Sequence, residues 1–133
     1  MSFPLAVFFL RAAAVLRKGS STDLNTWADA FNAGCAAIAE LGGARLGDRT
    51  MLDALIPASE AFRAAIKTGQ PLADVLRVTA ETARRGAQAT TNMPPRRGRS
   101  SYLGDRVLGH PDPGAEAVAL WLRAIAAVPP RPK

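Results

Sequence analysis

The stretch TMLDALIPASEAFRAAIKTGQPLADVLRVTAETARRGA, residues 50–87, decides the fold class. Its apolar residues recur at intervals of three and four, which places them on one face of a helix. Thr50 followed by Asp53 is a pattern that starts a helix, and a Gly69–Pro71 turn ends one helix and opens the next. We therefore predict two successive helices. Their inward residues are Leu52, Leu55, Ile56, Phe62 and Ile66 in the first, and Leu72, Val75, Leu76, Thr79, Ala83 and Ala87 in the second.

Two more helices are predicted before this pair. The first runs from about Pro4 to Arg17 and ends in a cationic turn followed by glycine. The second begins near Thr22, a suitable N-cap with Asp23 in the first turn, and ends at the glycine pair 42–43. Its inward face consists of Leu24, Trp27, Phe31, Cys35 and Ile38.

A long loop and a last helix follow the central pair. Residues 92–111, NMPPRRGRSSYLGDRVLGHP, are rich in proline, glycine and arginine and have no helical periodicity. A loop of this length in a compact domain is more often functional than not. Asp112 and Pro113 suit the N-cap and the first position of the last helix, and residues 129–133 are predicted to be a disordered tail. The inward face of this helix is predicted to be Val118, Trp121, Leu122, Ile125 and Val128.

The composition agrees with a single all-α domain over residues 1–133. Hydrophobic residues make up 48% of the chain, and many of them are alanines, which favour helix because they lose no side-chain entropy on ordering. No run of alternating β-branched residues indicates a strand. We expect an antiparallel up-and-down helical bundle or barrel of about five helices, incomplete as a barrel.

The charge is strongly basic, with 17 Lys and Arg against 11 Asp and Glu and a formal net charge of +6. Such a balance favours polyanions: nucleic acid, an anionic membrane surface, or phosphate groups in one site. A solvated basic surface with no partner explains the charge equally well. Net charge alone leaves these alternatives open.

Cys35 and His110 are the only residues of their kinds. One cysteine cannot form an intrachain disulfide, and one of each cannot form a Cys/His metal cluster. Cys35 lies at helical spacing from Phe31 and Ile38, so we expect a core thiol rather than a nucleophile.

The opening stretch MSFPLAVFFLRAAAVLRKG, residues 1–19, is predicted to be a core helix. Its basic residues follow the apolar run, whereas a secretory signal has them before it, and the run is too short to span a bilayer. An organellar transit peptide stays open, because such peptides are rich in arginine and poor in acids. We expect a cytoplasmic protein without a membrane partner.

In an up-and-down bundle, the loops after the second and fourth helices lie at the same end. Gly42, Thr50, Met51 and Arg99 would then face the start of the last helix. The free amides at the start of a helix favour an anion, and arginine forks bind phosphate oxygens or stack on a base. Each feature also has a purely structural explanation: Gly42 would be part of a helix C-cap, Thr50 an N-cap, and the arginine-rich loop a solubilising surface.

Two longer motifs favour one reading. GDRTMLDALIPA, residues 47–58, and GRSSYLGDRVLGHPDPGA, residues 98–115, resemble the nucleotide-binding part of the ATP-side domain of dihydroxyacetone kinases. The similarity extends from about Phe8 to Ile125. It implies a barrel of antiparallel helices, usually eight, that binds magnesium-ATP at one end. It also implies phosphoryl transfer to dihydroxyacetone held through a histidine on a separate domain or subunit.

The resemblance carries nucleotide contacts to particular positions. Gly42, Thr50 and Met51 would lie on the adenine side, Arg99 would contact ADP or ATP from the loop, and Asp112-Pro113-Gly114 would contact it from the last helix. No catalytic residue is assigned.

The family's magnesium ligands are not found in this sequence. Relatives hold the metal with aspartates in an N-terminal GDxDxG-type turn and hold phosphates with a Ser/Gly-rich segment before the FFLRAA helix. We therefore expect no metal site here and an isolated chain that is inactive. The partners expected are the substrate-binding subunit and a complementing N-terminal segment or a second copy.

Two alternatives to a kinase subunit remain. The chain could be a non-catalytic interaction or regulatory module of the same fold. Nucleic-acid binding through the Arg96–Arg106 loop is the least favoured reading, and we expect no nucleic-acid partner.

Overall fold

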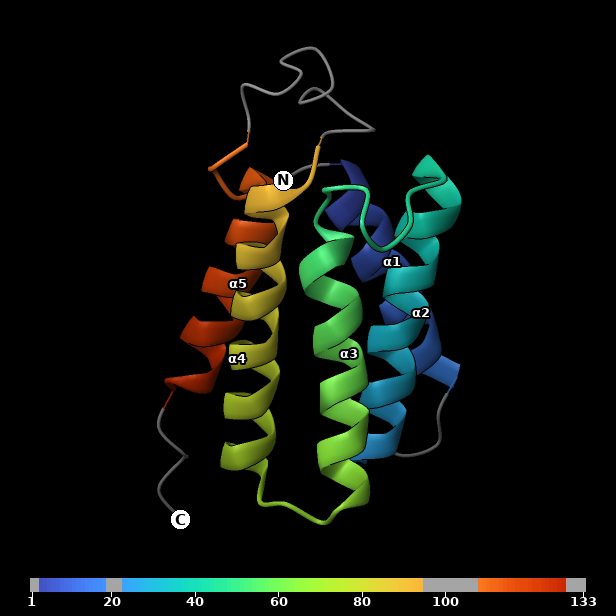
Figure 1. Ribbon diagram of the computed structural model, residues 1–133. Coiled ribbons are helices and arrows are strands. Elements are labelled where there is room, and N and C mark those ends of the chain that lie inside the picture. The colour runs from blue at the N-terminus through green and yellow to red at the C-terminus, as the bar shows by residue number, and fades with distance from the viewer. Residues whose placement is uncertain (1–2, 19–22, 95–107, 129–133) are drawn as a thin grey trace.

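The protein is an antiparallel bundle of helices, as the computed structural model of residues 3–18, 23–94 and 108–128 shows (Figure 1). Each helix packs on the next one along the chain, and α3 also contacts α5. The described residues contain no strand, so the all-α prediction is confirmed. The elements are α1 (Phe3–Lys18), α2 (Leu24–Gly42), α3 (Leu52–Lys67), α4 (Leu72–Ala89), the 3₁₀-helix η1 (Thr90–Asn92) and α5 (Pro113–Ala126).

The ends of α2 have clear local causes. Asp23, not Thr22, is the N-cap, because its Oδ1 accepts a hydrogen bond from the Thr26 N–H at 2.9 Å. The prediction for this helix start was therefore wrong by one residue, and Thr22 lies outside the described residues. At the other end Gly43 adopts φ 66°, a left-handed conformation, and its N–H donates to the Ala39 carbonyl at 2.8 Å.

The predicted start of α5 at Asp112 is confirmed, whereas α3 begins at Leu52 with Met51 as its N-cap, so the predicted start at Thr50 was wrong by one residue. The side chains of Thr50 and Asp53 still accept backbone amides at this helix start. Thr50 Oγ1 accepts the Leu52 N–H at 3.1 Å, and Asp53 Oδ2 accepts the Thr50 N–H at 3.0 Å. In α5, Asp112 Oδ2 accepts the Ala115 N–H at 3.0 Å. Both helices thus begin with a side chain that satisfies amides which the helix itself leaves unpaired.

Small residues let the helices approach closely. Alanines supply more than half of the larger buried cluster, which joins α2, α3, α4 and α5. At Gly86 of α4 the contact is closest: a Cβ there would lie 2.1 Å from the carbonyl oxygen of Asp53 in α3. At Gly34 of α2 a Cβ would lie 2.5 Å from the ring of Phe8 in α1. The backbone spacing of α3 and α4 therefore requires glycine at position 86, whereas a side chain at position 34 would have to move the Phe8 ring.

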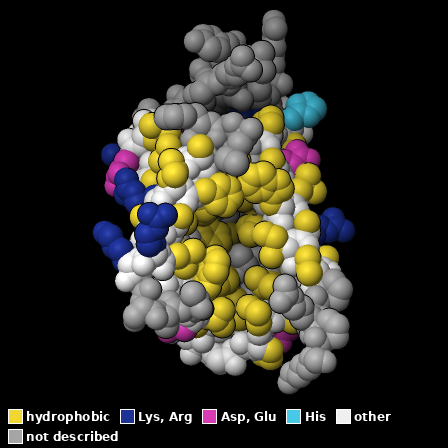
Figure 2. All heavy atoms as spheres, turned by 180° about the vertical axis from the view of Figure 1, so that it is seen from behind, with side chains coloured by type: hydrophobic (Ala, Val, Ile, Leu, Met, Phe, Trp, Pro, Cys, Tyr) yellow, Lys and Arg dark blue, Asp and Glu magenta, His cyan; other side chains and the backbone are white. Residues whose placement is uncertain are grey.

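The inward face predicted for the last helix is only partly buried. Val118 is buried, but Trp121 is 44%, Ile125 52% and Val128 69% exposed. The burial predicted for those three residues was therefore wrong. Trp121 and Ile125 border an open apolar hollow of about 700 Å³ that all five helices line. Figure 2 shows apolar side chains surrounding this hollow on the back of the bundle.

α1 and α5 form the two edges of the hollow. They approach each other at Phe9 and Trp121, whose ring centroids lie 6.2 Å apart. Trp27 on the second helix also borders the hollow and is 48% exposed, although its spacing predicted a buried position. Within residues 3–18, 23–94 and 108–128, no helix has both the length and the hydropathy needed to cross a membrane.

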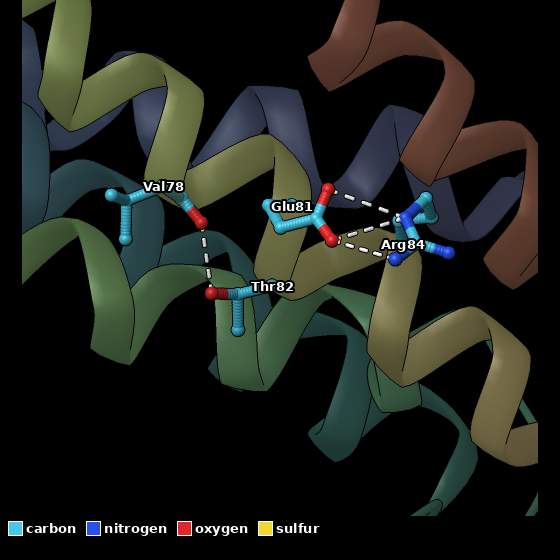
Figure 3. Close-up of polar contacts among 4 residues, drawn as sticks. All are labelled: Val78, Glu81, Thr82 and Arg84. Carbon is cyan, nitrogen blue, oxygen red and sulfur yellow. Dashed lines mark hydrogen bonds and ion pairs between the residues drawn. The ribbon is translucent and has the colours of Figure 1, made fainter.

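The outer face of α4 is charged and solvated. Arg84 donates to Glu81 at 2.6 Å, and Thr82 Oγ1 donates to the Val78 carbonyl at 2.8 Å (Figure 3). The hydrogen bond from Arg84 lowers the pKa of Glu81. Because both charged side chains are about half exposed, the pair contributes little to stability. Part of the positive charge of the chain therefore lies on a solvated helix surface.

Gly86→Ala should destabilise the bundle. The new methyl group would meet the Asp53 carbonyl, so α3 and α4 must separate, at a cost of roughly 1–3 kcal/mol. The free energy of unfolding by urea measures this cost. Gly42→Ala is the matched control, since a Cβ at Gly42 meets no atom within 4 Å. Equal stabilities of the two variants would contradict the close packing of α3 on α4.

Candidate functional site

Three chain segments meet at one pole of the bundle, the upper end in Figure 1. They are the α2–α3 turn, the end of α4 with η1, and the segment that leads into α5. The Arg49 side chain donates from the turn to the carbonyl oxygens of Thr90 and His110, the latter at 2.7 Å. The Asp112 N–H donates to Thr90 Oγ1 at 2.7 Å. The loops that the up-and-down topology predicts at one end are therefore in direct contact.

The α2–α3 turn is ordered by its own polar groups. The Arg45 N–H donates to Asp48 Oδ2 at 3.0 Å, and the Asp48 N–H donates back to the Arg45 carbonyl at 3.1 Å. Gly47 adopts φ 95° and Arg49 φ 62°, so two left-handed residues reverse the chain before α3. This conformation costs glycine little, whereas it strains Arg49.

Asp53 is the buried acceptor that closes the turn onto α3. Its side chain is 2% exposed, and its two oxygens accept the N–H groups of Gly47 at 2.6 Å and Thr50 at 3.0 Å. Both carboxylate oxygens are thus used by the backbone. Asp53 therefore fixes the positions of Thr50 and Met51.

Met51 and Gly114 are neighbours across the pole. A Cβ at Gly114 would lie 3.4 Å from Met51 Cε and 3.2 Å from Asp112 Oδ2. The start of α5 therefore lies against the residue that precedes α3. A side chain larger than a methyl group at Gly114 would displace Met51 or the Asp112 carboxylate.

The seven residues predicted to contact nucleotide divide into three groups. Met51, Asp112 and Gly114 are in mutual proximity, with Thr50 beside Met51 in the turn. Pro113 is exposed at the start of α5, and Gly42 ends α2 at the same pole. Arg99 lies outside the described residues, as do positions 95–107 of the predicted loop and the predicted tail 129–133.

Sequence reasoning missed Arg49 and Thr90. Thr90 is fully buried, accepts from the Asp112 amide and donates from Oγ1 to the Ala87 carbonyl at 2.5 Å. Nothing in the sequence around Thr90 distinguishes it from a surface threonine. Arg49 could have been suspected from the sequence, since it is a charged residue directly before Thr50, the predicted helix start.

Asp112 is electrostatically unusual. Burial raises its pKa, while the Ala115 and Gly114 amides and the positive charge of Arg49 oppose that shift, and the charge of Asp53 adds to it. The buried carboxyl is therefore easier to protonate than an exposed aspartate.

The described residues at this pole do not form a carboxylate cluster for a magnesium ion. In the part of the chain that the structure describes, no three His, Cys, Asp or Glu side chains are grouped to hold a metal ion. The carboxylate of Asp53 is occupied by two amides, and Asp112 Oδ2 by one. Magnesium takes oxygen ligands in octahedral geometry, usually one or two carboxylates together with waters and substrate phosphates.

Cys35 is excluded as a nucleophile. It is buried in the core, and burial raises the pKa of its thiol to about 12. The thiolate form is then negligible at neutral pH. The prediction of a core thiol is confirmed.

Comparison with known proteins decides the family. The profile of the DAK2 domain matches residues 5–127, nearly the whole chain. The chain belongs to the DAK2 domain family. That DAK2 match begins in α1, two residues after its start, and ends directly after α5, so it contains every later helix in full.

The relatives reported for this DAK2 domain carry the names of kinases or of a kinase subunit. The chain is 44% identical over 120 residues to the triokinase/FMN cyclase of Mus musculus, covering 90% of this chain and 21% of that protein. It is 34% identical over 119 residues to the ADP-binding subunit DhaL of the PEP-dependent dihydroxyacetone kinase of Escherichia coli, covering 90% of this chain and 57% of that subunit.

A solved structure supports the same fold. The dihydroxyacetone kinase of C. freundii in complex with AMP-PNP and Mg²⁺ matches with a TM-score of 0.67 and 32% identity. The match covers 93% of this chain and 19% of that one. The chain thus spans about a fifth of the long relatives and just over half of the E. coli subunit.

Asp112→Asn should change the pH dependence of stability. Because folding raises the pKa of Asp112 above the ordinary value of an aspartate, the folded state binds more protons than the unfolded state as the pH rises past that ordinary value. The stability of the wild type should therefore fall relative to Asp112→Asn as the pH is raised from acidic to neutral. Urea unfolding across this range measures the difference.

Glu116→Gln is the control for this pH series, since it removes an exposed carboxylate from the same helix turn. Asn at position 112 can still accept the Ala115 amide, so the cap is retained. A wild type that gains stability relative to Asp112→Asn with rising pH would contradict burial as the dominant influence.

Proposed function

We propose that the pole formed by Thr50, Met51 and the start of α5 binds ADP or ATP. The observation that carries the proposal is the proximity of Met51 to Gly114, since the two motifs that resemble the kinase family are far apart in sequence. The positive dipole ends of α3 and α5 and the buried charge of Arg49 favour an anionic ligand there. Arg99 and Gly42 would complete the site, and the ADP-binding relative supports it.

The reaction would be phosphoryl transfer to dihydroxyacetone or a similar ketose held by a partner subunit. The terminal phosphoryl group of ATP would pass to a hydroxyl oxygen of the ketose, and ADP would remain at the pole. Transfer of this kind depends on metal ions that neutralise the phosphoryl charge. Because the described residues form no carboxylate cluster for magnesium, this chain alone would bind nucleotide without catalysing transfer.

The magnesium ligands would come from helices that also cover the apolar hollow. This chain matches 57% of the E. coli subunit, so about two fifths of that subunit has no counterpart in the sequence given. The hollow opens to solvent on the back of the bundle, with α1 and α5 as its edges and the rings of Phe9 and Trp121 meeting at its rim (Figure 2). We take its occupant to be helices equivalent to that unmatched part, with apolar faces that contact Trp27 and Trp121.

A non-catalytic module is the second candidate. The observation that favours it is the use of both buried carboxylates at the pole as backbone acceptors rather than metal ligands. Such a module would bind a partner through the same fold without transferring phosphate. Adding the missing helices as a separate fragment, as described below, distinguishes this candidate from a kinase subunit.

Gly114→Val should weaken nucleotide binding. The larger side chain would displace Met51 and the Asp112 carboxylate, and we expect affinity for Mg-ADP to fall by about tenfold or more. Isothermal titration calorimetry of the 133-residue chain measures it. Ala117→Val, on an exposed position of α5, should bind like the wild type. Absence of Mg-ADP binding by the wild type would overturn the nucleotide site.

Trp121→Glu should prevent completion of the bundle. The unmatched segment of the E. coli subunit, added as a separate fragment, should shift the fluorescence of Trp27, the tryptophan that wild type and variant share, to shorter wavelength. With a substrate-binding subunit, Mg²⁺ and ATP present, dihydroxyacetone phosphate should then form. A glutamate in the hollow should abolish both effects, because an unpaired buried charge is costly.

Leu120→Glu is the matched control for the reconstitution. Leu120 is the neighbour of Trp121 in α5, but it is 57% exposed and lines the outer groove between α4 and α5 instead of the hollow. This variant should retain the fluorescence shift and the product. Fragment binding without any product above background would favour the non-catalytic module.

A further inference from the structure

Arg49 combines three unfavourable features at one residue. Its side chain is 2% exposed although a guanidinium stays charged in proteins, and its φ of 62° makes it the one non-glycine residue with positive φ in the described ranges. Its Nε is buried and has no hydrogen-bond partner. Strained and unsatisfied groups of this kind cluster at functional sites.

The contacts of Arg49 reach two distant parts of the chain. Nη1 donates to the carbonyl of Thr90 in η1, directly after α4, and Nη2 donates at 2.7 Å to the carbonyl of His110, two residues before the N-cap of α5. Thr90 also accepts the amide of Asp112. One planar guanidinium therefore sets the α2–α3 turn against the segments on both sides of the long loop.

The hydrogen-bond partners of Arg49 are backbone carbonyls, not carboxylates. Asp53 directs its oxygens at the amides of Gly47 and Thr50, and Asp112 directs Oδ2 at the amide of Ala115. A lysine has three donors on a single nitrogen, so it cannot reproduce two nitrogens that donate from one fixed plane. This side chain therefore fixes the relative positions of the backbone segments that it contacts.

We propose that Arg49 is a positioning residue that holds Thr50 and Met51 in register with Gly114 for nucleotide binding. This inference rests on the proposed function. Arg49 itself need not touch the ligand: it acts through the turn that it terminates and through the carbonyls on which α5 is seated. Its strain and burial are then the cost of keeping two separate helix starts aligned.

Arg49→Lys tests the inference, since it keeps the positive charge and loses the planar fork. We expect affinity for Mg-ADP to fall by about tenfold, measured by calorimetry. We also expect loss of the nuclear Overhauser contact between the Met51 methyl group and the Gly114 α-protons. Arg49→Gly, which relieves the left-handed strain, is the second variant if Arg49→Lys does not fold, and it should lose the same contact.

Gly34→Ala is the control for a purely structural effect. It lowers stability through the Phe8 ring on the α1–α2 interface, which is not part of the pole. If the loss of affinity came from lower stability alone, Gly34→Ala would weaken Mg-ADP binding as Arg49→Lys does. We expect it to bind within about twofold of the wild type.

The outcomes separate the two claims. Wild-type binding together with unchanged affinity and an unchanged Met51–Gly114 contact in Arg49→Lys would overturn the role of Arg49 and leave the nucleotide site standing. Equal losses in Arg49→Lys and Gly34→Ala would overturn it as well. No Mg-ADP binding by the wild type would overturn the proposed function, and the positioning role with it.

Discussion

The buried guanidinium of Arg49 and the two carbonyls that it contacts determine the geometry of the polar pole. Helix packing brings α3, α4 and α5 together along their lengths, but it does not fix how the turn before α3 meets the start of α5. Hydrogen bonds from a charged donor contribute about 1.5–3 kcal/mol each, enough to offset a left-handed backbone at Arg49. The same side chain places a positive charge under the helix starts that we assign to a nucleotide.

The small-residue core below the pole makes this arrangement rigid. Gly86 allows α4 to contact the backbone at Asp53, and Asp53 in turn fixes Thr50 and Gly47 through their amides. A change in helix spacing at Gly86 would therefore reach the proposed site through one hydrogen-bonding residue. The back of the bundle is not held by close packing of this kind, because the apolar hollow edged by α1 and α5 opens to solvent there. Packing and hydrogen bonds thus fix the backbone where nucleotide is proposed to bind. The apolar face where further helices are proposed to pack is uncovered.

Local rules predicted most of the fold. The spacing of Leu52, Leu55 and Phe62 predicted the correct helix, and the hydrogen bonds of Asp53 and Asp112 form as expected because they depend on a few neighbouring residues. The N-cap of α3 is Met51 rather than Thr50. Thr22 and Asp23 could not be separated, since both are good caps and side-chain geometry decides between them. The exposure of Trp121 could not be predicted, because periodicity reveals an apolar face but not whether anything covers it.

The site was predictable only in part. The proximity of Met51 to Gly114 follows from the up-and-down topology and is confirmed, whereas Arg99 stays a prediction. Arg49 could not be derived, because its partners are backbone carbonyls that no sequence pattern marks. The most direct test of the account is a titration of the ¹⁵N-labelled chain with Mg-ADP, followed by NMR. The account predicts that the amides of Thr50, Met51 and Gly114 shift together with one affinity while those near Gly69, at the other pole, do not move. Shifts confined to residues around the hollow, or no shifts at all, would contradict it.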